Sequence, residues 1–282
     1  MSNLIDTEMR VVFPEARNKS FCIENKEVQL HKTIYSHKKI RISLKQATVE
    51  HLLNIMTNYK IKSTIISGLN WQNLKNLKLN NNYLRYCINK YPKKLKIFYN
   101  VNFVSQDLYL ESLKLINSKL DKNVLGIEFH HSSFFKIHHP KNKKRFLNLC
   151  KIIKKKNKYI RFIGRYPSQH KINLINIYIS LIKKLNYKKI IFTSLGGGIE
   201  NYFLKNIKKI NFKPIFLTSA SKSLQTLNKS WKICPKNIVY ASDYPFNIFE
   251  TYKSFFNTFN KLKIPLKYKS IIKYKNAKQK FF

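Results

Sequence analysis

The stretch Asn237-Ile-Val-Tyr-Ala-Ser-Asp243 is a short run of β-branched and aromatic residues that ends in a carboxylate. Such a run predicts a buried strand. Similar runs occupy residues 2–6, 62–67, 96–101, 126–130, 159–164, 189–194 and 214–220, and segments with helical spacing of apolar residues lie between them. Eight strand-then-helix units in 282 residues predict an α/β fold, a (β/α)₈ TIM-like barrel, with an open doubly wound sheet as the alternative.

One interval interrupts this spacing. Between Arg10 and Ala47 no clean strand or helix is evident, and in a barrel this segment is the first connection from strand to helix. We expect residues 11–47 to form a long loop over the C-terminal mouth, where active sites of such barrels lie. Nothing in the sequence indicates a second domain, so residues 1–282 are expected to form one barrel.

The charge of the chain is extreme but its composition argues against a nucleic-acid partner. There are 55 Lys+Arg and 13 Asp+Glu, which gives a formal net charge of +42, yet only seven of the basic residues are Arg. Surfaces that bind phosphate or bases usually recruit Arg. The excess of Lys, Asn, Ile, Tyr and Phe indicates an AT-rich genome and a solvated surface. Lysine clusters at 141–144 and 151–158 leave nucleic-acid binding as an alternative, which a steep salt dependence would support.

The spacing of cysteines and charged residues predicts the compartment of the protein and whether it spans a membrane. The four cysteines are widely spaced without a CxxC pair, and charged residues interrupt the N-terminal segment, so a cytoplasmic location is expected. No run of about 18 apolar residues is free of charge, which predicts no membrane span.

Several strand ends carry recognisable motifs. They are Ile5-Asp6-Thr7-Glu8-Met9-Arg10, Gly126-Ile-Glu-Phe-His130, Ser194-Leu-Gly-Gly-Gly198, Tyr240-Ala-Ser-Asp243-Tyr-Pro-Phe246 and Tyr274-Lys-Asn276-Ala277, with Trp71, Asn81-Asn82-Tyr83-Leu84 and Tyr91-Pro92 near the second helix. In this order they resemble the amidohydrolase-related family, the metal-dependent hydrolase barrels of the amidohydrolase superfamily. The resemblance covers most of the chain. It implies a site at the carboxyl ends of the strands that holds one or two divalent metals, commonly zinc, with a strand-8 Asp that shuttles a proton.

The chain departs from that pattern at nearly every metal ligand. Glu8 and Arg10 stand where the family has two strand-1 histidines, and Ser194 replaces the strand-6 histidine. The position of the strand-5 histidine falls within residues 163–165, where no histidine occurs. Since a guanidinium cannot bind a metal and repels one, the ordinary zinc site is expected to be absent.

Three interpretations of the remaining mouth residues stay open. In the first, Asp243 is a general base, His130 assists, and Arg10 and Arg165 hold an anionic substrate, as in a metal-independent lactonase of the superfamily. In the second, Asp6, Glu8 and Asp243 bind Mg²⁺ or Mn²⁺ rather than Zn²⁺. In the third, the chemistry has decayed and the barrel binds or scaffolds.

We expect the first interpretation, with no cofactor assigned. The predicted activity is hydrolysis of a small anionic amide, lactone or ester, or else decarboxylation, with Asp243 and His130 catalytic and a small molecule as the partner. Substrate-binding residues would be Arg10, Arg165, Ser194 and Trp71, although an aromatic residue such as Trp71 is more often packing. The resemblance leaves the oligomeric state open, and a homodimer is one expectation because the family often forms dimers.

Overall fold

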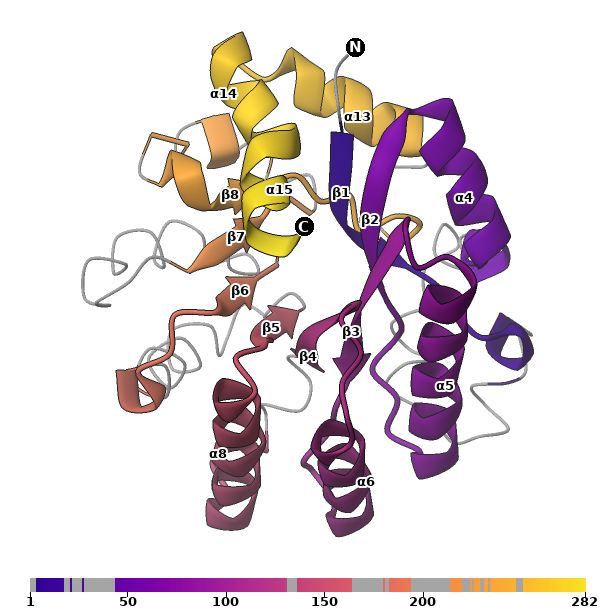
Figure 1. The fold of residues 1–282 in the computed structure, drawn as a ribbon, viewed down its shortest axis with the longest axis vertical. Coiled ribbons are helices and arrows are strands. Elements are labelled where there is room, and N and C mark those ends of the chain that lie inside the picture. The colour runs from indigo at the N-terminus through magenta and orange to yellow at the C-terminus, as the bar shows by residue number, and fades with distance from the viewer. Residues whose placement is uncertain are drawn as a thin grey trace.

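The computed structural model describes residues 4–17, 21, 27, 44–130, 136–163, 180, 183–193, 214–219, 224, 226–228, 231–232, 234–246 and 251–282. Eight parallel strands lie side by side in chain order (Figure 1). They are β1 (Leu4–Arg10), β2 (Ile61–Ser67), β3 (Leu95–Asn100), β4 (Val124–His130), β5 (Tyr159–Ile163), β6 (Ile190–Phe192), β7 (Ile215–Leu217) and β8 (Ile238–Val239). Each of the eight overlaps a run predicted from the sequence, although β1 extends to Arg10, beyond the predicted 2–6.

The sheet curls until its two edge strands meet. Thr7 N–H donates to the backbone oxygen of Tyr240 at 3.0 Å, and Arg10 N–H donates to that of Tyr244 at 2.7 Å. In the opposite direction, Asp243 N–H donates to the backbone oxygen of Glu8 at 2.7 Å. These contacts make the sheet a nearly closed barrel, so the predicted (β/α)₈ architecture is confirmed and the open sheet is excluded.

Helices cover the outside of the barrel, and the last of them closes its bottom (Figure 1). They are α4 (Val49–Asn58), α5 (Leu74–Lys90), α6 (Gln106–Asn117), α8 (Pro140–Lys155), α13 (Tyr252–Lys261) and α14 (Leu266–Ser270), followed by a π-helical turn (Ile271–Lys275) and α15 (Asn276–Phe281). A hydroxyl oxygen caps the start of three of them: Thr48 accepts from His51 N–H, Ser105 from Leu108 N–H and Thr251 from Ser254 N–H. These three helices therefore begin at residues that satisfy one of their free N–H groups, whereas α8, α14 and α15 begin without a side-chain cap.

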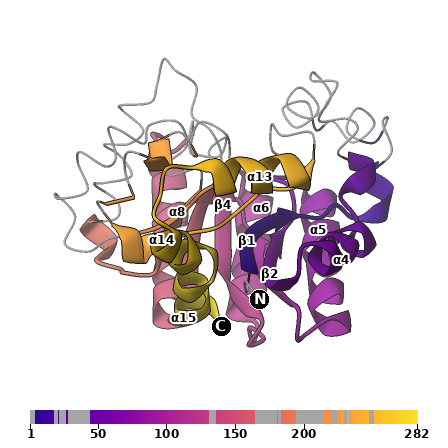
Figure 2. The ribbon, with the colours of Figure 1, turned by 90° about the horizontal axis from the view of Figure 1, so that it is seen from above.

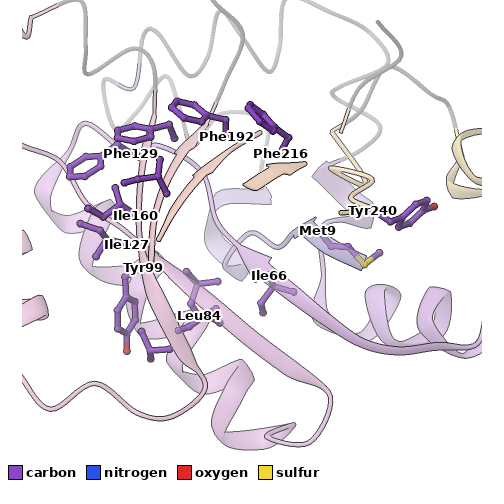
Figure 3. Packing of buried hydrophobic residues seen from close by; sticks show 14 of the residues in the cluster. Met9, Ile66, Leu84, Tyr99, Ile127, Phe129, Ile160, Phe192, Phe216 and Tyr240 are labelled. Carbon is purple, nitrogen blue, oxygen red and sulfur yellow. The ribbon is translucent and has the colours of Figure 1, made fainter. Parts of the chain in front are cut away.

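Four phenylalanines form a row across neighbouring strands on the outer face of the sheet. Phe129, Phe162, Phe192 and Phe216 are register partners on β4, β5, β6 and β7. Successive ring centroids are 6.1, 5.3 and 6.2 Å apart and the rings are stacked. Figure 3 shows three of these rings together above Ile127 and Ile160. Cross-strand aromatic pairs of this kind fix the register of neighbouring strands.

A second, smaller cluster fills the barrel interior below the mouth. It takes Ile5, Ile65, Phe98, Ile191, Val239 and others from almost every strand, and Ala277 and Phe281 of α15 complete it. The start of β1 and the end of α15 lie at the same end of the barrel (Figure 2). The bottom is therefore closed by α15, and the polar residues gather at the other end.

Part of the long connection after β1 also lies within the described residues. The buried carboxylate of Glu27 accepts hydrogen bonds from the N–H groups of Gln72 and Asn73 at the start of α5, and Phe21 packs on Phe13 and Trp71. Residues 18–20, 22–26 and 28–43 lie outside the described residues, so the expected loop over the mouth stays a prediction.

Candidate active site

Arg10, the last residue of β1, lies at the centre of the barrel mouth with three carboxylates around its guanidinium. Nε donates to Oδ1 of Asp243 at 2.8 Å, Nη2 to Oε1 of Glu8 at 2.9 Å and Nη1 to Oε1 of Glu128 at 3.0 Å. The side chains of Arg10, Glu8 and Glu128 are 7%, 1% and 1% exposed, whereas that of Asp243 is 29% exposed. Strands far apart in the sequence thus place opposite charges together, and little water can screen the interaction of Arg10 with Glu8 and Glu128.

The end of β2 supplies two further oxygens to the same guanidinium. Nη1 of Arg10 donates to Oγ of Ser67 at 2.9 Å and to the backbone oxygen of Gly68 at 2.8 Å. A Cβ at Gly68 would overlap the side-chain amide of Asn80 on α5. Glycine is required where β2 and α5 approach this closely.

Glu128 is shared between Arg10 and Arg161, its register partner on β5. Nε of Arg161 donates to Oε2 of Glu128 at 2.7 Å, and Nη2 forms an ion pair with the same oxygen. Nδ2 of Asn100 donates to Oε1 at 2.9 Å, and the Arg161 guanidinium lies 4.2 Å from the centroid of the Phe98 ring. We name Glu8, Arg10, Glu128, Arg161 and Asp243 the charge cluster.

Burial and neighbouring charges decide the protonation of the charge cluster. Burial raises the pKa of Glu8 to about 8, and the Asp243 carboxylate adds to the rise. Burial also acts to raise the pKa of Glu128, but Arg161 and Arg10 outweigh it and leave that pKa below its ordinary value. Burial therefore favours the protonated form of Glu8, whereas the two guanidiniums favour the charged form of Glu128.

Asp6 is a separate buried acid next to the charge cluster. Its Oδ1 accepts from the N–H groups of Glu8 and Ser242, both at 3.1 Å, and its Oδ2 lies 3.1 Å from the Tyr252 hydroxyl. Burial raises the pKa of Asp6 to about 7 against these hydrogen bonds. Asp6 therefore ties β1 to the segment after β8 and to α13.

Asp243 follows β8 at a backbone φ of 55°, in the left-handed region that side chains other than glycine seldom occupy. The N–H bond to Glu8 and the ion pair with Arg10 hold it there. Strained backbone of this kind occurs often at functional sites. Of the acids in the charge cluster, only Asp243 extends toward solvent.

The other predicted site residues fall in different surroundings. His130 ends β4 and is half-buried, whereas Trp71 is fully buried, with Nε1 donating to Oδ1 of Asn80 at 3.1 Å and its ring 5.1 Å from that of Phe13. These contacts of Trp71 are those of a packing residue. Arg165 and Ser194 lie outside the described residues, so their roles remain predictions.

The sequence analysis did not select Glu128 and Arg161 as site residues. Each is the single charged residue inside an apolar strand, in Gly126-Ile-Glu-Phe and Tyr159-Ile-Arg-Phe. A lone charge within a buried strand needs an opposite charge inside the barrel, and one acid and one base on neighbouring strands satisfy that need. This signal was present in the sequence.

The described residues do not fit a bound metal ion. Both oxygens of Asp6 are hydrogen-bonded, and Glu8 and Asp243 face the guanidinium of Arg10. Within the described part of the chain, no three His, Cys, Asp or Glu side chains are grouped so that they could hold one. The predicted Mg²⁺ or Mn²⁺ ligands Asp6, Glu8 and Asp243 thus lie near one another but point to other partners.

Known proteins resemble this chain closely in fold but only weakly in sequence. The chain matches no family model, and no curated protein resembles it in sequence. Among solved structures, 2,6-dihydroxybenzoate decarboxylase from Rhizobium is similar at 14% identity and a TM-score of 0.68, over 100% of this chain and 99% of that one. 5-Carboxyvanillate decarboxylase from Sphingomonas paucimobilis is similar at 14% identity and a TM-score of 0.71, with the same coverage.

Two further solved structures define this group of neighbours. An amidohydrolase II is similar at 12% identity and a TM-score of 0.67, over 99% of both chains. A 5-carboxyvanillate decarboxylase from Novosphingobium aromaticivorans, solved with manganese and a nitrobenzoic acid, is similar at 13% identity and a TM-score of 0.70, over 99% of this chain and 96% of that one. The predicted resemblance to amidohydrolase-related barrels is therefore confirmed at the level of the fold. In the described residues, no helix has the length and apolar character that crossing a bilayer requires.

Proposed function

We propose that this chain is an enzyme that acts on a small anionic substrate, with Asp243 as the group that takes and returns a proton. The observation that carries the proposal is the contrast in exposure within the charge cluster. Asp243 is 29% exposed at the mouth, while the side chains of Glu8 and Glu128 are each 1% exposed. A general base has to reach its substrate, and Asp243 satisfies that condition.

The proposed chemistry is hydrolysis of an amide, lactone or ester. Arg10 is the counter-ion of Asp243, and the charged carboxylate is the form that can accept a proton from water. As that water attacks the carbonyl carbon, Asp243 takes its proton and then passes it to the leaving oxygen or nitrogen. His130, at the end of β4, is proposed to assist.

Anion binding is assigned to Arg165 and Ser194 rather than to Arg10. The guanidinium of Arg10 faces Glu8, Glu128 and Asp243, so a negatively charged substrate group would compete with three carboxyls for it. Arg165 belongs to the connection after β5, and connections of this kind supply substrate contacts in such barrels. The net charge of +42 favours the approach of anions in general.

Decarboxylation of an aromatic acid is the second candidate. It is favoured by the neighbours, which include decarboxylases of 2,6-dihydroxybenzoate and 5-carboxyvanillate. In that reaction the carbon–carbon bond to the carboxyl group breaks, carbon dioxide leaves, and protonated Asp243 donates its proton to the ring carbon.

A pH-stat assay with a panel of carboxylate-bearing lactones, esters and hydroxybenzoic acids separates the two reactions. Hydrolysis of an ester releases acid, whereas decarboxylation consumes a proton and yields carbon dioxide. Asp243→Asn should lower the rate by about 10²–10⁴-fold with the fold retained. Turnover that survives this change would exclude Asp243 as the base, and a panel without turnover would favour the binding or scaffolding alternative.

A further inference from the structure

Among the described residues, the hydrogen-bond partners of the Arg10 guanidinium form a shell of oxygens. Three are carboxylate oxygens of Glu8, Glu128 and Asp243, at 2.9, 3.0 and 2.8 Å, and the others are Oγ of Ser67 and the backbone oxygen of Gly68. Hard divalent cations prefer a shell of carboxylate, carbonyl and hydroxyl oxygens. The shell therefore has the chemistry of a divalent cation site with a guanidinium at its centre.

The shell is held in place from outside. Glu128 is fixed by Arg161 and by Asn100, and Nδ2 of Asn80 in turn donates to Oδ1 of Asn100 at 2.9 Å. The backbone of Arg10 is fixed by its N–H bond to Tyr244. Neither the cation nor its carboxylate partners can move aside without breaking buried hydrogen bonds, which are costly to lose.

We propose that Arg10 is a permanent internal cation that takes the place of a divalent metal in this barrel and excludes one. The guanidinium neutralises Glu128 and Asp243, orients Asp243 at the mouth and is never released. The distances of 2.8–3.0 Å suit N–H donors, whereas Mg²⁺ requires oxygens at about 2.1 Å. The proposal concerns the binding of cations and does not depend on the proposed reaction.

The wild-type chain provides the first test. Full-length protein is freed of metal, incubated with MnCl₂, dialysed and analysed for manganese, and its melting temperature is measured with and without the ion. We expect no stoichiometric manganese and no shift in melting temperature. Uptake of about one ion per chain with a raised melting temperature would overturn the proposal.

Two variants provide the second test. Arg10→Ala and Arg10→His remove the internal cation and leave the acidic shell, and Arg10→His adds a metal ligand. We expect both to take up about one Mn²⁺ per chain and to melt at a higher temperature with it, because the acidic oxygens of the shell are then left without a cation. A folded variant that binds no manganese would overturn the proposal. If neither variant folds without metal, folding that is recovered by MnCl₂ supports the proposal, and folding that is not recovered opposes it.

Arg85→Ala is the matched control. Arg85 is an exposed arginine on α5 whose Nε contacts the hydroxyl of Tyr99, so its removal deletes a guanidinium outside the shell. This variant should bind no manganese. N-ethylguanidinium at millimolar concentration should raise the melting temperature of Arg10→Ala and leave that of Arg85→Ala unchanged. Equal effects on both variants would show that the guanidinium site at the mouth is not specific.

Discussion

Nε of Arg10 lies 2.8 Å from Oδ1 of Asp243, which joins the last residue of the first strand to the turn that follows the eighth. The two residues are 233 positions apart in the chain. Their ion pair places the proposed base and its counter-ion at the seam where the barrel closes. Closure of the fold and assembly of the site are therefore one event.

The exposure of this ion pair limits its contribution to stability. Because Asp243 is 29% exposed, water screens part of the interaction, and Asp243→Asn should lower the free energy of unfolding by only about 1 kcal/mol. Denaturant unfolding monitored by circular dichroism measures this. A loss of several kcal/mol would show that Asp243 is chiefly a structural residue.

The buried ion pair of Glu128 and Arg161 should contribute more to stability than that of Arg10 and Asp243. Removing one partner from Glu128 and Arg161 leaves the other charge buried alone, so Glu128→Gln and Arg161→Met should each cost about 3–5 kcal/mol. The double variant should recover part of that loss, since no charge is left unpaired. Lys78→Met combined with Glu111→Gln, an outer pair with side chains 48% and 20% exposed, is the control and should show little coupling.

Stability should fall as the pH rises through neutrality. Folding raises the pKa of Asp6 from 3.8 to about 7 and that of Glu8 from 4.5 to about 8. The folded state therefore binds more protons than the unfolded state between pH 3.8 and about 7 for Asp6, and between pH 4.5 and about 8 for Glu8. Each group then lowers the free energy of unfolding by up to about 1.4 kcal/mol per pH unit within its window.

Asp6→Asn and Glu8→Gln should each flatten this dependence, because each amide imitates the protonated acid. The measurement is chemical denaturation at several pH values from 5.5 to 8.5, compared with Asp107→Asn, which changes an exposed acid on α6. The same slope in all four proteins would show that Asp6 and Glu8 do not titrate in this range.

The phenylalanine row should contribute strongly to stability. Phe162 stacks between Phe129 and Phe192, so Phe162→Ala should cost about 3–5 kcal/mol, whereas Phe162→Leu should cost less because it leaves a smaller cavity. Tyr86→Ala, at a side chain that is 48% exposed, is the control and should change stability little. Similar losses for the three variants would rule out a special role for the row.

Gly126 should tolerate no side chain. A Cβ at this position of β4 would overlap the backbone of Tyr159 on β5, and backbone cannot move aside as a side chain can. Gly126→Ala should therefore destabilise the barrel, as a lower melting temperature would show. An unchanged melting temperature would mean that β4 and β5 can separate without cost.

The sequence predicted the architecture better than the site. The strands appeared as β-branched and aromatic runs because strands covered on both faces are apolar throughout, as Ile190–Phe192 illustrates. Asp243 and Arg10 were found from motifs at strand ends. That Arg10 would face Glu128 could not be predicted, because their contact depends on how far the barrel closes and on the stagger of strands 118 residues apart.

The position of α15 at the bottom of the barrel affects the order in which the chain folds. Phe281 and Ala277 complete the interior cluster, and the Tyr159 hydroxyl donates to the backbone oxygen of Lys280 at 2.7 Å. On the ribosome, strands β1–β8 all emerge before these residues, with the apolar interior still open at one end. During synthesis the nascent barrel therefore exposes apolar surface until α15 has emerged and covers it. Before that point the chain is most prone to aggregate and most in need of chaperones.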